Sequence, residues 1–230
     1  EYWQTHAYYG PGTVFVEEPN TTSQIFNGNL TYNKAGWVVH MLRGVMGDSL
    51  FFDALQSYAY NDSLAYGAVT TENFQAVCED VSGLDLDDFF QQWIYGDYYP
   101  RYRVSWEMLD TDELVVTIEQ MQSWQYFNMP IDLQVVLPQD TLEFTVDNQG
   151  QSQEYNLGLI GGSAYSVRLD PDNWILKEVE YLSVAGPLPD QAQLILYPAY
   201  PNPFNPKTSI LYYVPNDLGE IEPTIHIYDV

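Results

Sequence analysis

The hydrophobic period of the chain changes near Gly96 and Pro100, and this change limits the folds that it can adopt. Between residues 32 and 95, apolar residues recur every three or four positions, which is the spacing of amphipathic helices. After Pro100, apolar and polar residues alternate in short runs, which is the spacing of half-buried strands. An order of helices followed by strands predicts an α+β fold with two segregated layers.

The helical part is expected to contain four helices that form a bundle. Val38, Leu42 and Val45 share one face of the first helix. Gly47 breaks the chain, and Asp48 is expected to be the N-cap of a second helix over residues 50–60.

Capping patterns delimit the two later helices. Thr70 and Thr71 are expected to open the third helix, and Gly83 is a plausible left-handed residue just after its end. Asp85 and Asp88 open the fourth helix, where the helix dipole favours negative charge. Capping therefore explains these two carboxylates better than catalysis does.

Alternating segments after Pro100 predict an antiparallel β-sandwich of about six short strands. The expected strands cover residues 101–108, 114–121, 131–137, 142–146, 165–169 and 174–181, with residues 170–173 as the turn between the last two.

The C-terminal segment has a different composition. Residues 184–192 contain two prolines and a glycine and are expected to be a linker. Residues 193–230 begin with a proline-rich run and continue with alternating apolar residues, which predicts a partial small β-module that stops in mid-strand at Val230. The expected domains are therefore 1–100 (helical), 101–183 (β-sandwich), 184–192 (linker) and 193–230 (partial β-module), with truncation expected at both ends.

The charge balance of the 230 residues excludes some classes of partner. The chain has 32 acidic and 7 basic side chains, a formal net charge of −25. Nucleic acids and anionic membranes are bound by clustered Lys and Arg, so we expect neither as a partner. No apolar run is long enough to predict a transmembrane helix. Cys78 lies on an apolar helix face, which predicts a buried thiol and not a nucleophile.

An ordered series of motifs runs through the helical part. It includes Tyr32-x-Lys34-x-Gly36, then Gly47-Asp48, Ser82-Gly-Leu-Asp-Leu86 and Phe89-Phe-Gln-Gln-Trp93. With this series, residues 13–106 resemble the C-terminal part of the catalytic domain of the aminopeptidase N family, which are gluzincin zinc metallopeptidases with a thermolysin-like domain, and the start of the next domain. Ala35-Gly36 departs from the Gly-Ala order that is usual in that family.

The resemblance implies a role for Tyr32, which in that family donates its hydroxyl to the tetrahedral intermediate. Packing at a helix start is the alternative for Tyr32, and Lys34 is expected to be a helix-surface charge. The resemblance also implies a peptide substrate and a zinc ion in the full-length parent. The His-Glu-x-x-His motif that holds zinc there is absent from this chain, whose histidines are His6, His40 and His226. We therefore expect no metal-binding or cofactor-binding residue here, a packed or half-exposed ring for His40, and no activity of this segment alone.

A second set of motifs lies near the C-terminus. Tyr197-Pro-Ala-Tyr-Pro-Asn-Pro-Phe-Asn-Pro206 is followed by alternating residues and by Ile227-Tyr-Asp-Val230. Residues 193–230 resemble the C-terminal sorting domain of type IX secretion cargo; the alternative is a generic proline-rich linker. The resemblance implies the type IX secretion machinery as a partner, and secretion or attachment at the outer-membrane surface of a Gram-negative bacterium.

Two functions remain open on the sequence. The first is a fragment of a secreted zinc metallopeptidase of the aminopeptidase type. The second is a non-catalytic secreted protein, in which a degenerate peptidase scaffold serves adhesion or binding through its acidic, tyrosine-rich β region.

Overall fold

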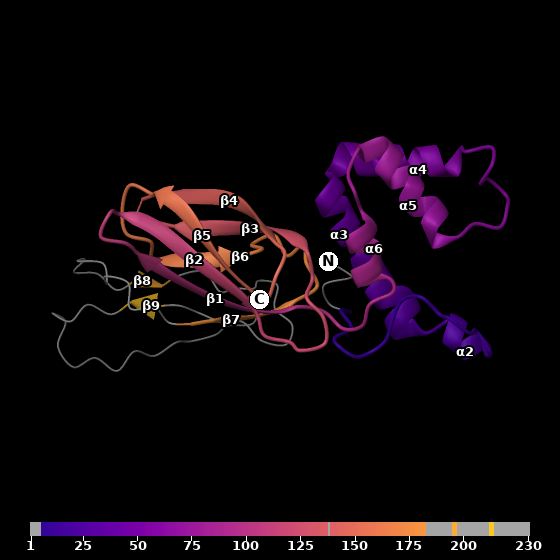
Figure 1. Cartoon of the computed structure of the whole chain (residues 1–230), viewed down its shortest axis with the longest axis horizontal. Coiled ribbons are helices and arrows are strands. Elements are labelled where there is room, and N and C mark those ends of the chain that lie inside the picture. The colour runs from indigo at the N-terminus through magenta and orange to yellow at the C-terminus, as the bar shows by residue number, and fades with distance from the viewer. Residues whose placement is uncertain (1–5, 138, 183–194, 197–211, 214–230) are drawn as a thin grey trace.

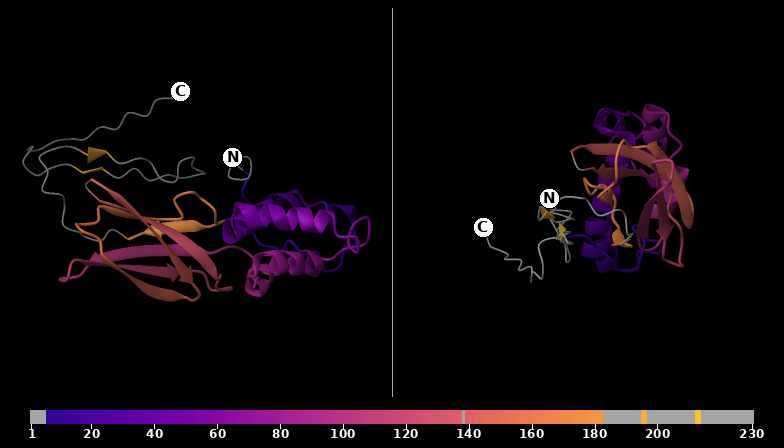
Figure 2. Two further views of the ribbon diagram at one scale, coloured as in Figure 1. Left: turned by 90° about the horizontal axis from the view of Figure 1, so that it is seen from above. Right: turned by 90° about the vertical axis from the view of Figure 1, so that its left-hand side faces the viewer.

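The computed structural model describes residues 6–137, 139–182, 195–196 and 212–213. Helices occupy one end of an elongated body and two sheets occupy the other, as Figure 1 and the turned view in Figure 2 both show. The mixed α+β class predicted from the change of period is therefore confirmed. The expected linker, residues 184–192, and most of the expected β-module, residues 193–230, lie outside the described residues.

Within the described residues, six helical segments precede the strands. They are α2 (Thr22–Ile25), the π-helix η1 (Gly28–Lys34), α3 (Ala35–Met46), α4 (Asp48–Ala59), α5 (Thr71–Ser82) and α6 (Asp87–Trp93). No described helix combines the length and the apolarity that are needed to cross a membrane.

Local sequence signals mark both ends of α5, whereas the start of α4 differs from the prediction. Thr70 and Asn73 form a reciprocal capping box at the start of α5, and Gly83 ends that helix with a φ of 71°, as expected. The assignment of Asp48 as an N-cap was wrong, because Gly47 takes that position. Asp48 lies inside the first turn of α4 and instead pairs with the Arg43 guanidinium at 2.7 Å.

Seven strands form two sheets, and a third sheet is a short pair. The strands are β1 (Arg101–Met108), β2 (Glu113–Gln120), β3 (Met129–Val136), β4 (Thr141–Asn148), β5 (Ser152–Leu159), β6 (Ser166–Leu169), β7 (Glu178–Tyr181), β8 (Ile195–Leu196) and β9 (Tyr212–Tyr213). The orders are β5-β2-β1-β7, β4-β3-β6 and β8-β9. The inward side chains of the first two sheets belong to one hydrophobic core.

The sheets differ from the prediction in three respects. Strand β5 was missed, since its sequence Ser-Gln-Glu-Tyr-Asn-Leu-Gly-Leu has few apolar residues to mark an alternation. The arrangement is not wholly antiparallel, because β7 pairs with β1 in parallel. The turn expected at residues 170–173 is present, with the Asn173 N–H donating to the Asp170 carbonyl at 3.1 Å, but the strand expected from residue 174 begins only at Glu178, and β6 pairs with β3 whereas β7 pairs with β1.

The carboxylate of Asp170 explains why the chain changes sheets at this point. Asp170 is 1% exposed, and it accepts hydrogen bonds of 2.8 Å from the backbone N–H groups of both Trp174 and Ile175. The ammonium of Lys177, also buried, lies 2.5 Å from the same carboxylate. These contacts turn residues 170–177 into a closed loop, so β7 starts beside β1 and not beside β6.

The same loop joins the sheets to the helices. Trp174 stacks on His40 of α3 with ring centroids 4.6 Å apart, and the Leu176 N–H donates to the sulfur of Met41 at 3.4 Å. A second junction lies at α6, where the Trp93 indole N–H donates to the sulfur of Met129 at 3.3 Å. Buried contacts of this kind make the two parts one packed unit.

Replacing Asp170 with Asn is expected to lower the free energy of unfolding by about 3–5 kcal/mol, because the Lys177 charge stays buried without its counter-ion. Denaturant unfolding followed by tryptophan fluorescence measures the change. Asp172→Asn is the matched control, since Asp172 lies in the same loop with an exposed side chain. Equal stability of the two variants would contradict a structural role for the buried pair.

Candidate functional site

Tyr32, the residue singled out by the sequence, lies in the π-helix η1, directly before α3. Its side chain is 51% exposed, so the ring is not buried under its neighbours. The Asn27 side chain caps the start of η1 by accepting hydrogen bonds from the N–H groups of Asn29 and Leu30, at 2.9 and 3.1 Å. π-Helices are rare and recur at functional sites, so this backbone is a suitable platform for a reactive side chain.

Lys34, two residues after Tyr32, is buried, and the expectation of a helix-surface charge was wrong. Its side chain is 1% exposed. Its ammonium donates to the carbonyl oxygens of Gly12 at 2.9 Å and Gly96 at 3.1 Å. Burial lowers the pKa of Lys34 from 10.5 to about 8, and the nearby Asp97 carboxylate opposes that shift.

His40, on α3, is a packed residue. Its ring lies between two indoles: it stacks on Trp174, and it meets Trp37 edge-on at 5.5 Å. Burial holds the pKa of His40 below its ordinary value, and the hydrogen bond to the backbone of Asn173 opposes the shift. The expectation of a packed ring is confirmed.

Cys78 is fully buried on α5. Burial raises the pKa of its thiol to about 11, with a smaller contribution from the Glu79 carboxylate. A thiol in that state is a poor nucleophile near neutral pH, so the expectation of an inert cysteine is confirmed.

A zinc site does not fit the residues that the structure describes. Among them, the side chains close enough to share a metal ion are the carboxylates of Glu79, Asp85 and Asp87. The Gln75 amide donates to Glu79 at 2.9 Å and to Asp87 at 2.6 Å, so these carboxylates have protein partners. Zinc is bound mainly by His and Cys, and this group contains neither.

Asp85 also explains the start of α6. Its carboxylate accepts from the Asp87 N–H at 3.1 Å, which satisfies one of the free donors at the helix start. Asp85 is thus bound at the helix start as expected, although the N-cap position itself is taken by Leu86, which has no side-chain cap. Asp88 differs, because it accepts at 2.6 Å from the Asn128 amide of the β part.

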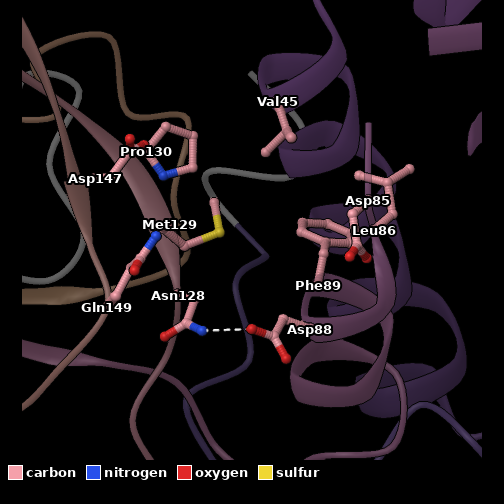
Figure 3. A pocket seen from close by; sticks show the side chains of 10 residues that line it. All are labelled: Val45, Asp85, Leu86, Asp88, Phe89, Asn128, Met129, Pro130, Asp147 and Gln149. Atoms are coloured by element: carbon pink, nitrogen blue, oxygen red, sulfur yellow. Dashed lines mark hydrogen bonds between the residues drawn. The ribbon is translucent and has the colours of Figure 1, made fainter. Parts of the chain in front are cut away.

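A pocket lies between α6 and the ends of β3 and β4 (Figure 3). The Asn128–Asp88 hydrogen bond crosses it, and the side chains of Phe89 and Met129 face each other from opposite walls. Tyr32 is not among its lining residues. The pocket is thus a feature of the helix–sheet junction, lined in part by the Ser82–Leu86 and Phe89–Trp93 motifs and not by Tyr32.

Known proteins are similar to this chain over the segment that contains Tyr32, Lys34 and His40. Residues 5–93 match the peptidase family M1 domain. Over 90 residues the chain is 32% identical to aminopeptidase M1-C of rice (Oryza sativa subsp. japonica), which covers 39% of this chain and 10% of the relative. Over 105 residues it is 29% identical to aminopeptidase N of Lactococcus lactis subsp. lactis, covering 46% of this chain and 12% of the relative.

A third relative carries a different name. The chain is 35% identical over 78 residues to transcription initiation factor TFIID subunit 2 of Schizosaccharomyces pombe, which covers 31% of this chain and 7% of that protein. The chain thus spans 7–12% of the length of these curated relatives.

The fold extends the likeness beyond residue 93. The crystal structure of Legionella pneumophila aminopeptidase A in complex with aspartic acid superposes with a TM-score of 0.64 at 17% identity, covering 76% of this chain and 20% of that one. Because 76% exceeds the share of residues 5–93, the superposition includes part of the β region. The resemblance of the helical part to aminopeptidase N-type proteins is therefore confirmed, whereas the role of Tyr32 stays a prediction.

The buried Lys34 predicts an unusual pH dependence of stability. Its pKa is about 8 in the folded protein and 10.5 in the unfolded chain, so the unfolded chain binds more protons between these values. The free energy of unfolding should therefore rise with pH through this window, by up to about 3 kcal/mol from Lys34.

Denaturant titrations at pH 7.5, 8, 8.5 and 9 on the unmodified chain and on Lys34→Met measure the effect. The difference between the two proteins isolates Lys34, because Cys78 and the buried tyrosines contribute equally to both. An unchanged difference across the series would contradict the burial of a titrating amine at this position.

Proposed function

We propose that this chain is the C-terminal part of a secreted, zinc-dependent metallopeptidase of the aminopeptidase type, which hydrolyses peptide bonds with Tyr32 as the oxyanion stabiliser. The observation that carries the proposal is the exposed phenol of Tyr32 on η1, inside the segment that matches the peptidase family M1 domain. The rice and Lactococcus relatives are named aminopeptidases, which supports the reaction class.

The chemistry suits a tyrosine. A phenol hydroxyl donates one hydrogen bond, and a donor aimed at the developing oxyanion stabilises the transition state more than the substrate. One such donor contributes about 3–4 kcal/mol to lowering the barrier. Activation of water at neutral pH needs a metal in this class of reaction, and no fitting ligand set is found among the described residues. The proposal therefore assigns the zinc ligands to another part of the protein and expects the present segment to be inactive alone.

The domain arrangement belongs to the same proposal. Residues 1–100 would be the C-terminal helical part of the catalytic domain, and residues 101–183 would form a β-sandwich domain that supports it. Residues 184–192 would link this domain to a sorting domain at residues 193–230. Both α3 and α6 pack on the β part, which favours a role of the sheets in stabilising the helical part. Type IX secretion and an outer-membrane or secreted location rest on the sequence of residues 193–230 alone, with its proline-rich motif, its alternating residues and Ile227-Tyr-Asp-Val230.

Replacing Tyr32 with Phe in the complete protein is expected to lower kcat about 10²- to 10³-fold with little change in KM, because the hydroxyl acts on the transition state. Hydrolysis of an aminoacyl reporter substrate measures both constants. Tyr60→Phe is the matched control, since Tyr60 is an exposed tyrosine at the end of α4. Full turnover of the Tyr32 variant would refute the assignment.

A second candidate is a non-catalytic secreted protein that uses a peptidase scaffold for binding or adhesion. The relative named as a transcription initiation factor subunit favours it, because a protein without a peptidase name shares this segment. Zinc analysis of the purified complete protein separates the two candidates. A metal-free protein with no activity on any aminoacyl reporter would establish the second.

A further inference from the structure

The ammonium of Lys34 is the meeting point of three chain segments. Lys34 itself belongs to η1, and its two acceptors are the carbonyl groups of Gly12 and Gly96, which are 22 and 62 residues away in the sequence. An ammonium has three donors and no acceptor, so backbone carbonyls are natural partners for it inside a protein. The side chain therefore holds η1 against the loops that contain Gly12 and Gly96, which are both distant from η1 in the sequence.

Both carbonyls come from glycines that have no room for a side chain. A Cβ at Gly12 would lie 2.7 Å from the Leu30 side chain, and the φ of Gly12 is +113°, a conformation that favours glycine. A Cβ at Gly96 would lie 2.2 Å from the Gln92 carbonyl oxygen. Glycine at these two positions keeps Leu30 and the Gln92 carbonyl in place, and the hydrogen bonds of 2.9 and 3.1 Å show that both backbones reach the Lys34 ammonium.

Asp97 completes the cradle. Its carboxylate accepts hydrogen bonds from the N–H groups of Gly12 and, at 2.9 Å, Tyr98, so the two loops are joined to each other as well as to Lys34. It is also the charge that favours the protonated form of Lys34. The arrangement is a compact pin of one cation, one anion and two carbonyls.

Lys34 lies on the buried side of η1, and Tyr32 on the same helix is exposed. Residues two positions apart on a helix do not face each other, so anchoring Lys34 on the buried side of η1 directs Tyr32 to the exposed side. We infer that Lys34 is the positioning residue for Tyr32: by holding η1 between the Gly12 and Gly96 loops, it fixes the direction in which the phenol hydroxyl points. This inference rests on the proposed function of Tyr32, since positioning matters for the reaction only where that hydroxyl takes part.

A double-mutant cycle on the complete protein tests the inference. Lys34→Met, which keeps the length of the side chain and removes its donors, should lower kcat about 10- to 100-fold with KM nearly unchanged, because small misplacement of a catalytic group costs rates of this order. In the Tyr32→Phe background the same substitution should lower kcat by no more than about twofold, since the hydroxyl that it positions is already gone. Equal losses in both backgrounds would show a purely structural role and overturn the inference.

Lys177→Met is the matched control, because Lys177 is the second buried lysine among the described residues and belongs to the loop 170–177, not to η1. It should lower the melting temperature and leave kcat of the folded protein unchanged. If Lys34→Met does not fold, Asp97→Asn replaces it: the amide still accepts from Gly12 and the charge beside Lys34 is lost. The same non-additivity with Tyr32→Phe is then expected, and additive losses would again overturn the inference.

A readout without activity separates failure of the inference from failure of the proposed function. Backbone amides of residues 31–35 in the 230-residue chain should exchange their hydrogens at least about tenfold faster in Lys34→Met, with amides of α5 unaffected. Unchanged exchange would overturn the pin itself. Faster exchange, together with a Tyr32→Phe protein of full activity, would leave the pin in place and refute the proposed function instead.

Discussion

The burial of one carboxylate sets the relation between the helices and the sheets. Asp170 closes the loop 170–177 through two backbone N–H groups and the Lys177 ammonium. That loop moves the chain from the sheet of β3 to the sheet of β1, and it lays Trp174 and Leu176 on α3. A buried ion pair is weak evidence for stability by itself, but this one determines which surfaces meet. The contact between this loop and α3 follows from it, beside the separate contact of α6 with Met129.

Most local signals were read correctly from the sequence, with the Asp48 N-cap and strand β5 as exceptions, whereas long-range ones were not. The capping box at Thr70 and the left-handed Gly83 depend on neighbours within four residues, so their patterns were visible. The burial of Lys34 depends on carbonyls at residues 12 and 96, and nothing in its immediate sequence marks it as buried. The glycines at these two positions were the available signal, but glycine is common in loops where no side chain approaches the backbone.

In the sheets too, strands marked by a local alternation were predicted and the long-range pairing of strands was not. Alternation found β1 to β4 within about two residues, whereas the pairing of β7 required knowledge of where residues 170–177 turn. Aspartate followed by proline reads as an ordinary turn, and only burial distinguishes the Asp170 carboxylate from its exposed neighbour Asp172. Strand β5 was missed because glutamine, asparagine and glycine interrupt its apolar positions. Tyr32 was singled out through family resemblance, and its exposure on η1 is compatible with the role assigned to it.

Both junction hydrogen bonds to sulfur end on thioethers, those of Met41 and Met129, which are buried. A thioether is a weak acceptor that fills irregular space between the helices and the sheets. Oxidation to the sulfoxide would add a polar oxygen to each site and alter the shape that the neighbours pack against. Burial slows attack in the folded protein, but a chain oxidised before folding would carry the lesion into the junction. Oxidation of Met41 or Met129 would thus disturb one of the two thioether contacts between the helical part and the sheets without touching Tyr32.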